Sequence, residues 1–91
     1  MKVTLEFNGV MENYYPDKQV DVSVPESATL ADLFQCIGRL KPALPESIWH
    51  YGENRFRGPV LITSDGKVLR DKNEKLYTGQ LVRLRRVLMG G

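Results

Sequence analysis

The sequence predicts an α+β domain in which one amphipathic helix packs across a mixed β-sheet. Alternating apolar and polar residues at 2–8 and 19–24 are typical of two half-buried strands. Apolar residues at helical spacing follow at 29–41, and further strands are predicted at 60–69 and from 81 to about 87. A hairpin, then a helix, then more strands is the pattern of this class of domain.

Turn and strand-breaking residues bound the first two strands. Val3–Phe7 alternates between apolar and polar residues, and Asn8-Gly9 follows as a turn signal. Gln19–Val24 alternates again and stops at Pro25, which cannot donate a ladder hydrogen bond. We therefore expect the second strand to return antiparallel to the first.

The helix carries both a start and a stop signal. Thr29 stands at the N-cap position, and Asp32 follows three residues later, where its side chain can reach back to the cap. Pro42 and Pro45 prevent continuation, so we expect a helix over about residues 29–41. Its apolar stripe consists of Leu30, Leu33, Phe34, Ile37 and Leu40.

The segment 42–57 has neither a helical nor a strand period. Trp49, Tyr51 and Phe56 are scattered among polar residues, which predicts an irregular loop with at most one short helical turn.

A short hairpin and a final strand are predicted after this loop. The apolar runs 60–63 and 68–69 flank the tight turn Ser64–Lys67. The polar run 70–75 then leads to a turn and to the final strand.

Length and composition describe one ordinary globular domain. The chain has 91 residues, of which 42% are hydrophobic and 26% charged, enough for a single core. We assign residues 1–87 to that domain and 88–91 to a flexible C-terminal Gly-Gly tail. Thirteen basic and eleven acidic residues leave a formal charge of +2, too small to indicate nucleic acid or an anionic membrane as a partner.

The sequence shows no signal for secretion or membrane insertion. No apolar run reaches the roughly 20 residues of a membrane span. Met1-Lys2 leads directly into the first strand pattern, without a basic segment and an apolar block. Cys36 is the single cysteine and cannot form an internal disulfide, so we expect a cytoplasmic protein.

The most informative motif is the terminal pair Gly90-Gly91, which follows an apolar strand studded with arginines. Glycine has no Cβ, so two in a row form a thin thread that can enter a channel too narrow for other residues. The Gly91 carboxylate is then the least hindered one that the chain can offer for acyl activation. We expect Leu88 and Met89, beyond the strand, to be interface residues of the tail.

Several segments together resemble a known family. These are the helix opening Thr29-Leu30-Ala31-Asp32-Leu33, the approach Leu76-x-x-Gly79-x-x-Val82, the order of elements and the terminal Gly90-Gly91. They resemble the ubiquitin-like β-grasp sulfur carriers, such as the small subunit of molybdopterin synthase and the sulfur carrier of thiamine biosynthesis. Gln80 stands where that family usually has an acid, and the arginines of the last strand are similar to ubiquitin's basic tail.

The resemblance implies a non-catalytic carrier that binds no cofactor by itself. An E1-like adenylating enzyme would consume ATP to activate Gly91, and a sulfur donor (a desulfurase or sulfide) would convert it to a thiocarboxylate. An acceptor synthase subunit would then take the sulfur for molybdopterin or thiamine formation. Two alternatives stay open: a ubiquitin-like modifier joined to lysines through Gly91, and a β-grasp interaction domain without tail chemistry.

The arginines of the last strand are the candidate partner-docking residues: Arg83, Arg85 and Arg86. Strand alternation places Arg83 and Arg85 on the face opposite Val82 and Leu84, outside the core. Arg55 and Arg57 with the aromatics of 42–57 also permit a nucleic-acid surface. Docking to an acidic patch of a partner protein explains the same arginines more simply, so we expect no nucleic acid.

No catalytic or metal-binding residues are predicted. Cys36 lies beside the apolar stripe of the helix, where a cysteine behaves as a small hydrophobe. His50 is the single histidine, and neither a paired cysteine nor a second histidine accompanies it. No P-loop spacing of glycines is present, so we do not expect the chain to bind ATP alone.

Overall fold

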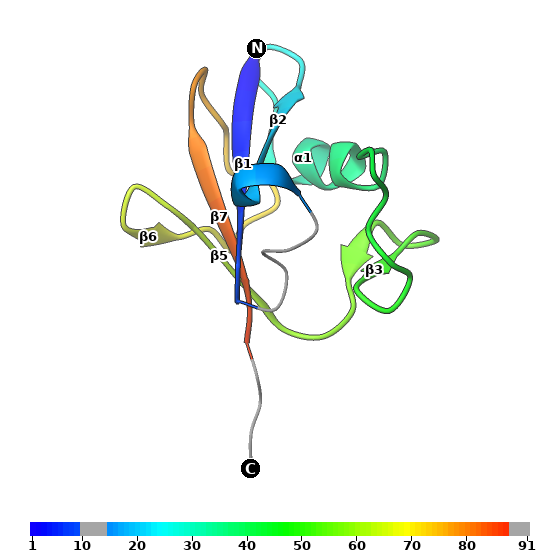
Figure 1. The fold of residues 1–91 in the computed structure, drawn as a ribbon. Coiled ribbons are helices and arrows are strands. Elements are labelled where there is room, and N and C mark those ends of the chain that lie inside the picture. Colours follow the sequence, from blue (N-terminus) through cyan, green and yellow to red (C-terminus); the bar gives the residue numbers. More distant parts are fainter. Residues whose placement is uncertain (10–14, 88–91) are drawn as a thin grey trace.

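The structure is a computed structural model that describes residues 1–9 and 15–87 (Figure 1). Strands and helices follow the predicted order, with a short 3₁₀ helix and a small second sheet in addition. The elements are β1 (Lys2–Asn8), η2 (Pro16–Lys18), β2 (Gln19–Ser23), α1 (Leu30–Ile37), β3 (Trp49–His50), β4 (Arg55–Phe56), β5 (Val60–Ser64), β6 (Lys67–Val68) and β7 (Leu81–Arg86).

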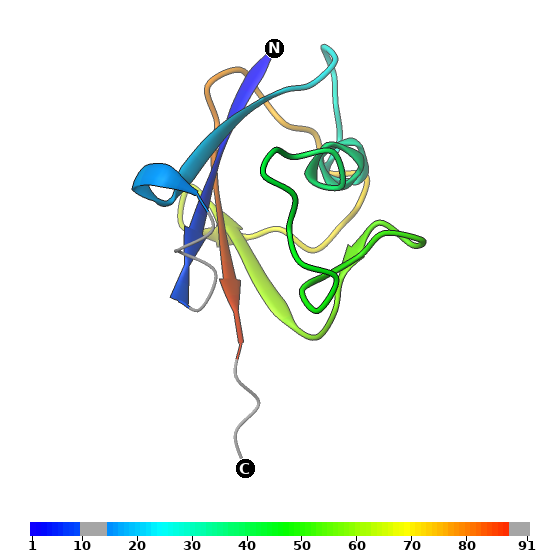
Figure 2. The same ribbon diagram turned by 45° about the vertical axis from the view of Figure 1, so that its right-hand side comes forward.

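The main sheet is mixed, as predicted. Its five strands lie in the order β2-β1-β7-β5-β6. The central pair β1 and β7 is parallel, whereas β2 pairs antiparallel with β1 and β5 pairs antiparallel with β7. Figure 2 shows α1 and the β3–β4 hairpin on the same side of this sheet. The opposite face carries no α-helix among the described residues.

The core lies between the sheet and α1. The alternating residues Val3, Leu5 and Phe7 of β1 are fully buried, and Val82 and Leu84 of β7 are buried beside them. At about 25 cal/mol per Å² of apolar surface removed from water, this layer is the main source of stability. The predicted period of two in the first and last strands is therefore confirmed.

The start of α1 agrees with the predicted cap. The Asp32 N–H donates to Thr29 Oγ1 at 3.4 Å, and the Thr29 N–H donates to Asp32 Oδ2 at 2.9 Å, so both halves of a capping box are present. These bonds satisfy two backbone donors that the helix itself leaves unpaired.

The predicted end of the helix is wrong, because α1 stops at Ile37 and not near residue 41. Beyond Gly38 the chain closes into tighter turns, in which the Arg39 N–H donates to Cys36 O at 3.0 Å and the Leu40 N–H donates to Ile37 O at 3.2 Å. Pro42 has no N–H to donate to Gly38 O and disfavours helical geometry at Lys41, so the helix cannot continue through this segment. Leu40 is still buried, which is why its place in the stripe suggested a longer helix.

Removal of the cap gives a direct test of the helix start. We expect Thr29→Ala to lower the free energy of unfolding by about 1 kcal/mol, because it deletes the acceptor for the Asp32 N–H. Thr78→Ala is the matched control, since Thr78 is exposed and its hydroxyl bonds to no described residue. Urea unfolding followed by circular dichroism measures both, and equal midpoints for the two variants would contradict the capping assignment.

The predicted irregular loop at 42–57 is wrong in part, because two short strands lie within it. β3 and β4 pair antiparallel there, with Trp49 opposite Phe56. Trp49 is fully buried and Phe56 is 8% exposed, and their rings lie edge to face at 4.8 Å between centroids. Phe34 of α1 meets both rings in T-shaped contacts at 6.0 and 6.3 Å. This hairpin is therefore a second wall of the core and not a surface loop.

The predicted hairpin after this segment is confirmed. β5 and β6 pair antiparallel around Asp65-Gly66, which have φ of 54° and 77°. Positive φ at both central residues is the requirement of the tight turn that matches strand twist, and Asp-Gly meets it. The hairpin lies at one edge of the sheet, with β5 beside β7.

Candidate functional site

The candidate site is strand β7 with the sheet face that it exposes, because β7 leads toward the Gly-Gly terminus. The described chain ends at Val87, whose N–H donates to Pro59 O at 3.0 Å. The predicted tail residues Leu88, Met89, Gly90 and Gly91 lie outside the described residues, so their assigned roles stay predictions.

The structure separates the three predicted docking arginines. Arg83 and Arg85 are exposed on the face opposite Val82 and Leu84, as the alternation predicts. Arg86 falls on the helix side of the strand and is half-buried, with its guanidinium near Gly58. Only Arg83 and Arg85 therefore share the open face of the sheet.

Arg83 and Arg85 differ in their partners. Arg83 Nε lies 3.4 Å from Glu6 Oε2 of the adjacent strand β1, an exposed ion pair. Arg85 has no ion pair with any residue in the ranges 1–9 and 15–87. Its positive charge is therefore available to an acidic group of a partner protein. Arg83 could bind such a group only by breaking or sharing its ion pair with Glu6.

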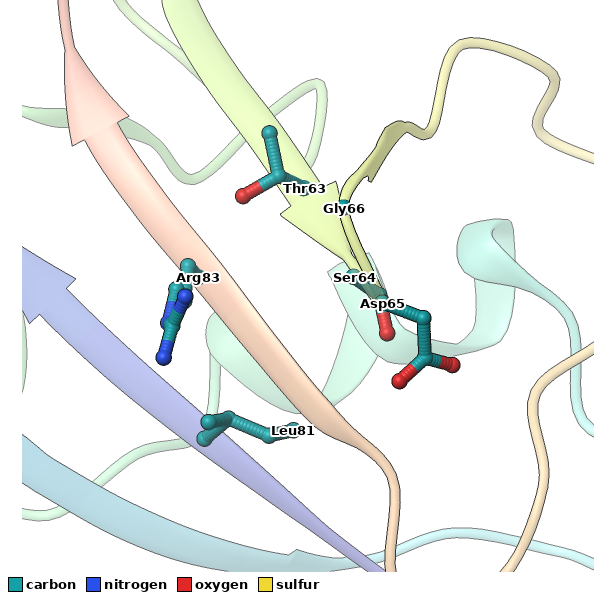
Figure 3. Close-up of a pocket in the computed structure, with 6 residues that line it drawn as sticks. All are labelled: Thr63, Ser64, Asp65, Gly66, Leu81 and Arg83. Atoms are coloured by element: carbon teal, nitrogen blue, oxygen red, sulfur yellow. The ribbon is translucent and has the colours of Figure 1, made fainter.

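Two shallow hollows flank Arg83 on this open face. The first, of about 290 Å³, lies between the start of β7 and the end of β5, and Figure 3 shows Arg83 and Leu81 on one side of it with Thr63, Ser64 and Asp65 on the other. The second hollow, of about 380 Å³, has Leu61 and Arg85 in its wall. Leu61 is 39% exposed, so the face combines cationic and apolar surface.

The turn before β7 is held by a buried polar contact. Gln80 is 5% exposed; its Nε2 donates to Ser64 Oγ at 2.9 Å, and its Oε1 accepts the Tyr77 N–H at 3.0 Å. Gly79 has φ of +81° and donates its N–H to Lys2 O at 2.7 Å. Glycine suits this position because its backbone adopts positive φ without strain. These bonds tie the start of β7 to both β1 and β5.

The residues that sequence reasoning missed are those that complete this face from other strands. Leu61 and Thr63 come from β5, and Glu6 comes from β1. Alternation along residues 60–63 places Leu61 on the face opposite Ile62, so the period contained a usable signal. Local sequence patterns do not specify that β1, β7 and β5 are neighbours in the sheet, because these strands lie far apart in the sequence.

Cys36 has no feature of a reactive nucleophile. It is half-buried, burial raises the pKa of its thiol above the ordinary value, and its Sγ–H donates to Ser23 O at 3.7 Å. A thiol with a raised pKa carries little thiolate at neutral pH. This agrees with the prediction that Cys36 is a packing residue.

Both ring nitrogens of His50 interact with Glu53 of the same hairpin. Its Nδ1 accepts the Glu53 N–H at 3.1 Å, and its Nε2 lies 3.4 Å from Glu53 Oε2. Within the described part of the chain, no three side chains of His, Cys, Asp or Glu come together as a metal site. The helices there are also too short to cross a membrane.

Two of the aromatic residues that a nucleic-acid surface would need, Trp49 and Phe56, are buried in the structure. Trp49 and Phe56 face the core, so neither presents a ring on which a base could stack. Tyr51 is 38% exposed, and its hydroxyl donates to Leu44 O at 2.6 Å. The arginines of this segment therefore lack the interleaved stacking surface that the alternative needs.

The mixed sheet, the α-helix packed on it and the parallel central pair define a ubiquitin-like β-grasp domain, as predicted. The chain is similar to the crystal structure of SAMP1 from Haloferax volcanii, with a TM-score of 0.77, 16% identity and full coverage of both chains. A second structure of H. volcanii small archaeal modifier protein 1 matches with a TM-score of 0.75 and 15% identity over 96% of this chain and 98% of that one.

A chain from the complex of subunits 1 and 2 of molybdopterin-converting factor from Helicobacter pylori is also similar. It has a TM-score of 0.63 and 18% identity, and each chain is fully covered. No family model matches this chain, and no curated protein sequence matches it. At these identities the likeness establishes the fold.

Proposed function

We propose that this protein is a sulfur carrier whose C-terminal Gly91 is activated by a partner enzyme and converted to a thiocarboxylate. The observation that carries the proposal is the course of β7, the central strand that presents Arg83 and Arg85 on an open face and whose sequence continues to Gly90-Gly91. A rigid domain with a docking face is thus followed directly in the sequence by an unhindered C-terminal acyl group. Delivery of that group into another protein's active site requires both features.

The chemistry belongs to the partner, and this chain supplies the acyl group. The Gly91 carboxylate attacks the α-phosphate of ATP, pyrophosphate leaves, and a mixed anhydride with AMP remains. Hydrosulfide then displaces AMP and leaves the thiocarboxylate, while a persulfide donor gives an acyl disulfide that a further thiol must cleave. Apart from the Gly91 carboxylate, which is the nucleophile of the first step, no residue of the chain is proposed to act as acid, base or nucleophile.

The proposed partners follow from this sequence of steps. An E1-like adenylating enzyme consumes the ATP, a desulfurase or sulfide provides the sulfur, and an acceptor synthase subunit receives it in molybdopterin or thiamine formation. The fold shared with a chain of the two-subunit molybdopterin-converting factor complex supports an acceptor of this kind. All three partners would be cytoplasmic.

Arg85 gives a test of the docking face. We expect Arg85→Glu to lower kcat/KM for activation by about tenfold, mainly through KM, because it places a negative charge before an acidic partner surface. Arg86→Glu makes the same charge change on the helix side of β7 and should cost less than about twofold. Equal losses in the two variants would contradict docking through the open face.

A ubiquitin-like modifier is the second candidate function. The observation that favours it is the fold shared with small archaeal modifier protein 1, together with the basic last strand. Carrier and modifier use the same acyl adenylate and differ in the nucleophile, which is sulfide or persulfide for the carrier and a lysine amine for the modifier.

A competition experiment separates these two functions. The purified chain is incubated with ATP and an extract of its native cells, with and without added hydrosulfide, and the C-terminal peptide is fragmented in a mass spectrometer. The carrier proposal predicts an oxygen-to-sulfur exchange on Gly91 that depends on ATP. Isopeptide-linked Gly91 as the sole product would support the modifier, and an unchanged Gly91 with added ATP would contradict both.

A further inference from the structure

The second hollow on the open face of the sheet is built by three strands that are distant in the sequence. Its lining residues come from the end of β1, from β7 and from β5: Asn8, Gly9, Arg83, Arg85, Leu61 and Thr63. These strands are adjacent in the sheet, in the order β1-β7-β5. The volume of about 380 Å³ is within the range of sites that bind small molecules.

The strand register arranges these residues as a grid. Arg85 lies between Asn8 of β1 and Leu61 of β5. Arg83 lies beside Thr63 of β5, and Figure 3 shows these two residues on neighbouring strands. Adjacent strands are about 5 Å apart, and residues two apart on one strand are separated by about 7 Å. Both guanidinium groups can therefore reach one small group placed between them.

The free hydrogen-bonding groups of the hollow are mostly donors. The side chains of Arg85, Thr63 and Asn8 form no hydrogen bond or ion pair with a described residue. A guanidinium has five N–H donors and no acceptor, while the hydroxyl and the amide add further donors. Such a set of donors, with positive charge, suits an anion that carries several acceptor oxygens.

Glu6 leaves most of Arg83 available to the hollow. Its Oε2 lies 3.4 Å from Arg83 Nε, and the terminal amino groups of Arg83 donate to no described residue. No carboxylate is among the described residues that line the hollow. Arg83, Arg85 and Glu6 together leave one net positive charge on this part of the face.

Two guanidinium groups discriminate between classes of anion. A carboxylate has two oxygens, and one guanidinium fork already satisfies both of them. Phosphate offers three or four oxygens in a tetrahedral arrangement, so it can accept bonds from both arginines at once. Its charge of about −2 at neutral to basic pH also exceeds that of chloride or a carboxylate. A phosphate group therefore fits the pair better than these other anions do.

We propose that the hollow between Arg83 and Arg85 binds a phosphate dianion, supplied as inorganic phosphate or as a phosphate monoester. Arg85 and the terminal amino groups of Arg83 donate to its oxygens, and Thr63 and Asn8 complete the set of donors. In a monoester, the organic group packs on Leu61, which is 39% exposed at one side of the hollow.

A phosphate bound here shares Arg85 with the face proposed for docking to an acidic partner. It neutralises the charge that the partner needs, so phosphate competes with docking and should raise the KM for Gly91 activation while kcat stays unchanged. This consequence rests on the proposed function. The site itself is tested on the isolated protein, without an activating enzyme.

An NMR titration of the isotope-labelled protein is the direct test. Sodium phosphate is added at about pH 8, where it is mostly a dianion, and sodium chloride at equal ionic strength is the matched control. We expect the backbone amide signals of Asn8 and Thr63 and the Arg85 Nε–H signal to shift saturably with a Kd of roughly 1–10 mM, since exposed ion pairs each contribute little. Chloride should give no saturable shift.

Phenyl phosphate separates the two sources of the dianion. Binding at least about fivefold tighter than inorganic phosphate, with an added shift of the Leu61 amide, would assign the site to a monoester whose apolar group contacts this residue. Equal binding of the two ligands would assign it to free phosphate.

Single substitutions separate the hollow from general electrostatics. Arg85→Ala should weaken phosphate binding by about tenfold, because it removes a charged donor. Arg70→Ala removes the same charge at an exposed position outside the hollow and should change Kd by less than about twofold. Glu6→Gln should tighten binding by about threefold, because it releases Arg83 from its ion pair.

Two results would overturn the proposal. One is an equal Kd for phosphate in Arg85→Ala and in the wild type. The other is a phosphate titration that shifts the Asn8 and Thr63 signals no more than chloride does. Neither result depends on whether Gly91 is activated, so failure of the phosphate site and failure of the proposed function are distinguishable.

Discussion

Replacement of Gly90 by tryptophan is expected to abolish activation of Gly91 while the domain stays folded. The proposed partner must accept the last residues in a narrow channel, and a bulky side chain one residue from the reacting carboxylate displaces it or blocks entry. A misplacement of about 1 Å at a reacting centre already costs roughly 10²-fold in rate. The measurement is the rate of ATP-dependent formation of the acyl adenylate, monitored through the pyrophosphate that this step releases.

A residue appended after Gly91 gives the complementary variant. It keeps the glycine thread and moves the carboxylate away from Gly91, so we again expect no activation. Thermal unfolding followed by circular dichroism provides the control, because the 1–87 body should melt within about 2 °C of the wild type in both variants. Activation at the wild-type rate in either one would contradict the role of Gly91.

Truncation of Trp49 is expected to have the largest effect on stability. The ring is fully buried and contacts Phe56 and Phe34, so Trp49→Ala should lower the free energy of unfolding by about 3–5 kcal/mol. For a domain that begins with about 5–15 kcal/mol, this is a large share of the total. Urea unfolding followed by circular dichroism measures the loss.

Trp49→Phe is the matched control. Trp49 Nε1 is buried and donates no hydrogen bond to any described residue, so phenylalanine removes volume without leaving a partner unpaired. We expect a cost of about 1–2 kcal/mol. If Trp49→Ala were as mild as this control, segment 42–57 would be a surface loop after all.

The strands and the helix start could be predicted because their signals are local. Val3, Leu5 and Phe7 repeat every second residue, and each is buried against the helix layer. The pairing of Thr29 with Asp32 spans three residues and forms the capping box of the first turn. In these cases the residues that indicate the element are the residues that stabilise it.

The end of α1 and the β3–β4 hairpin could not be predicted because their causes are not periodic. Leu40 fits the helical stripe and is buried, yet it reaches the core from a tight turn. Strands of two residues are too short to show an alternation, and Trp49 and Phe56 are recognised as core residues only once they pair with each other and with Phe34.

The candidate site was predictable in part for the same reason. Alternation separates Arg83 and Arg85 from Val82. The same alternation assigns Arg86 to the helix side of the strand, although the sequence prediction grouped it with the other two docking arginines. Leu61, by contrast, joins the face only through the pairing of β5 with β7, which no local pattern specifies.

The proposed function depends on Gly91 as the reacting group. The intact mass of the protein isolated from its native cells, with fragmentation of the C-terminal peptide, reports on this group directly. A sulfur carrier should show replacement of one oxygen by sulfur, confined to Gly91, in a fraction of the molecules. An unmodified Gly91 carboxylate in cells that contain the activating enzyme and its sulfur donor would contradict the proposed function.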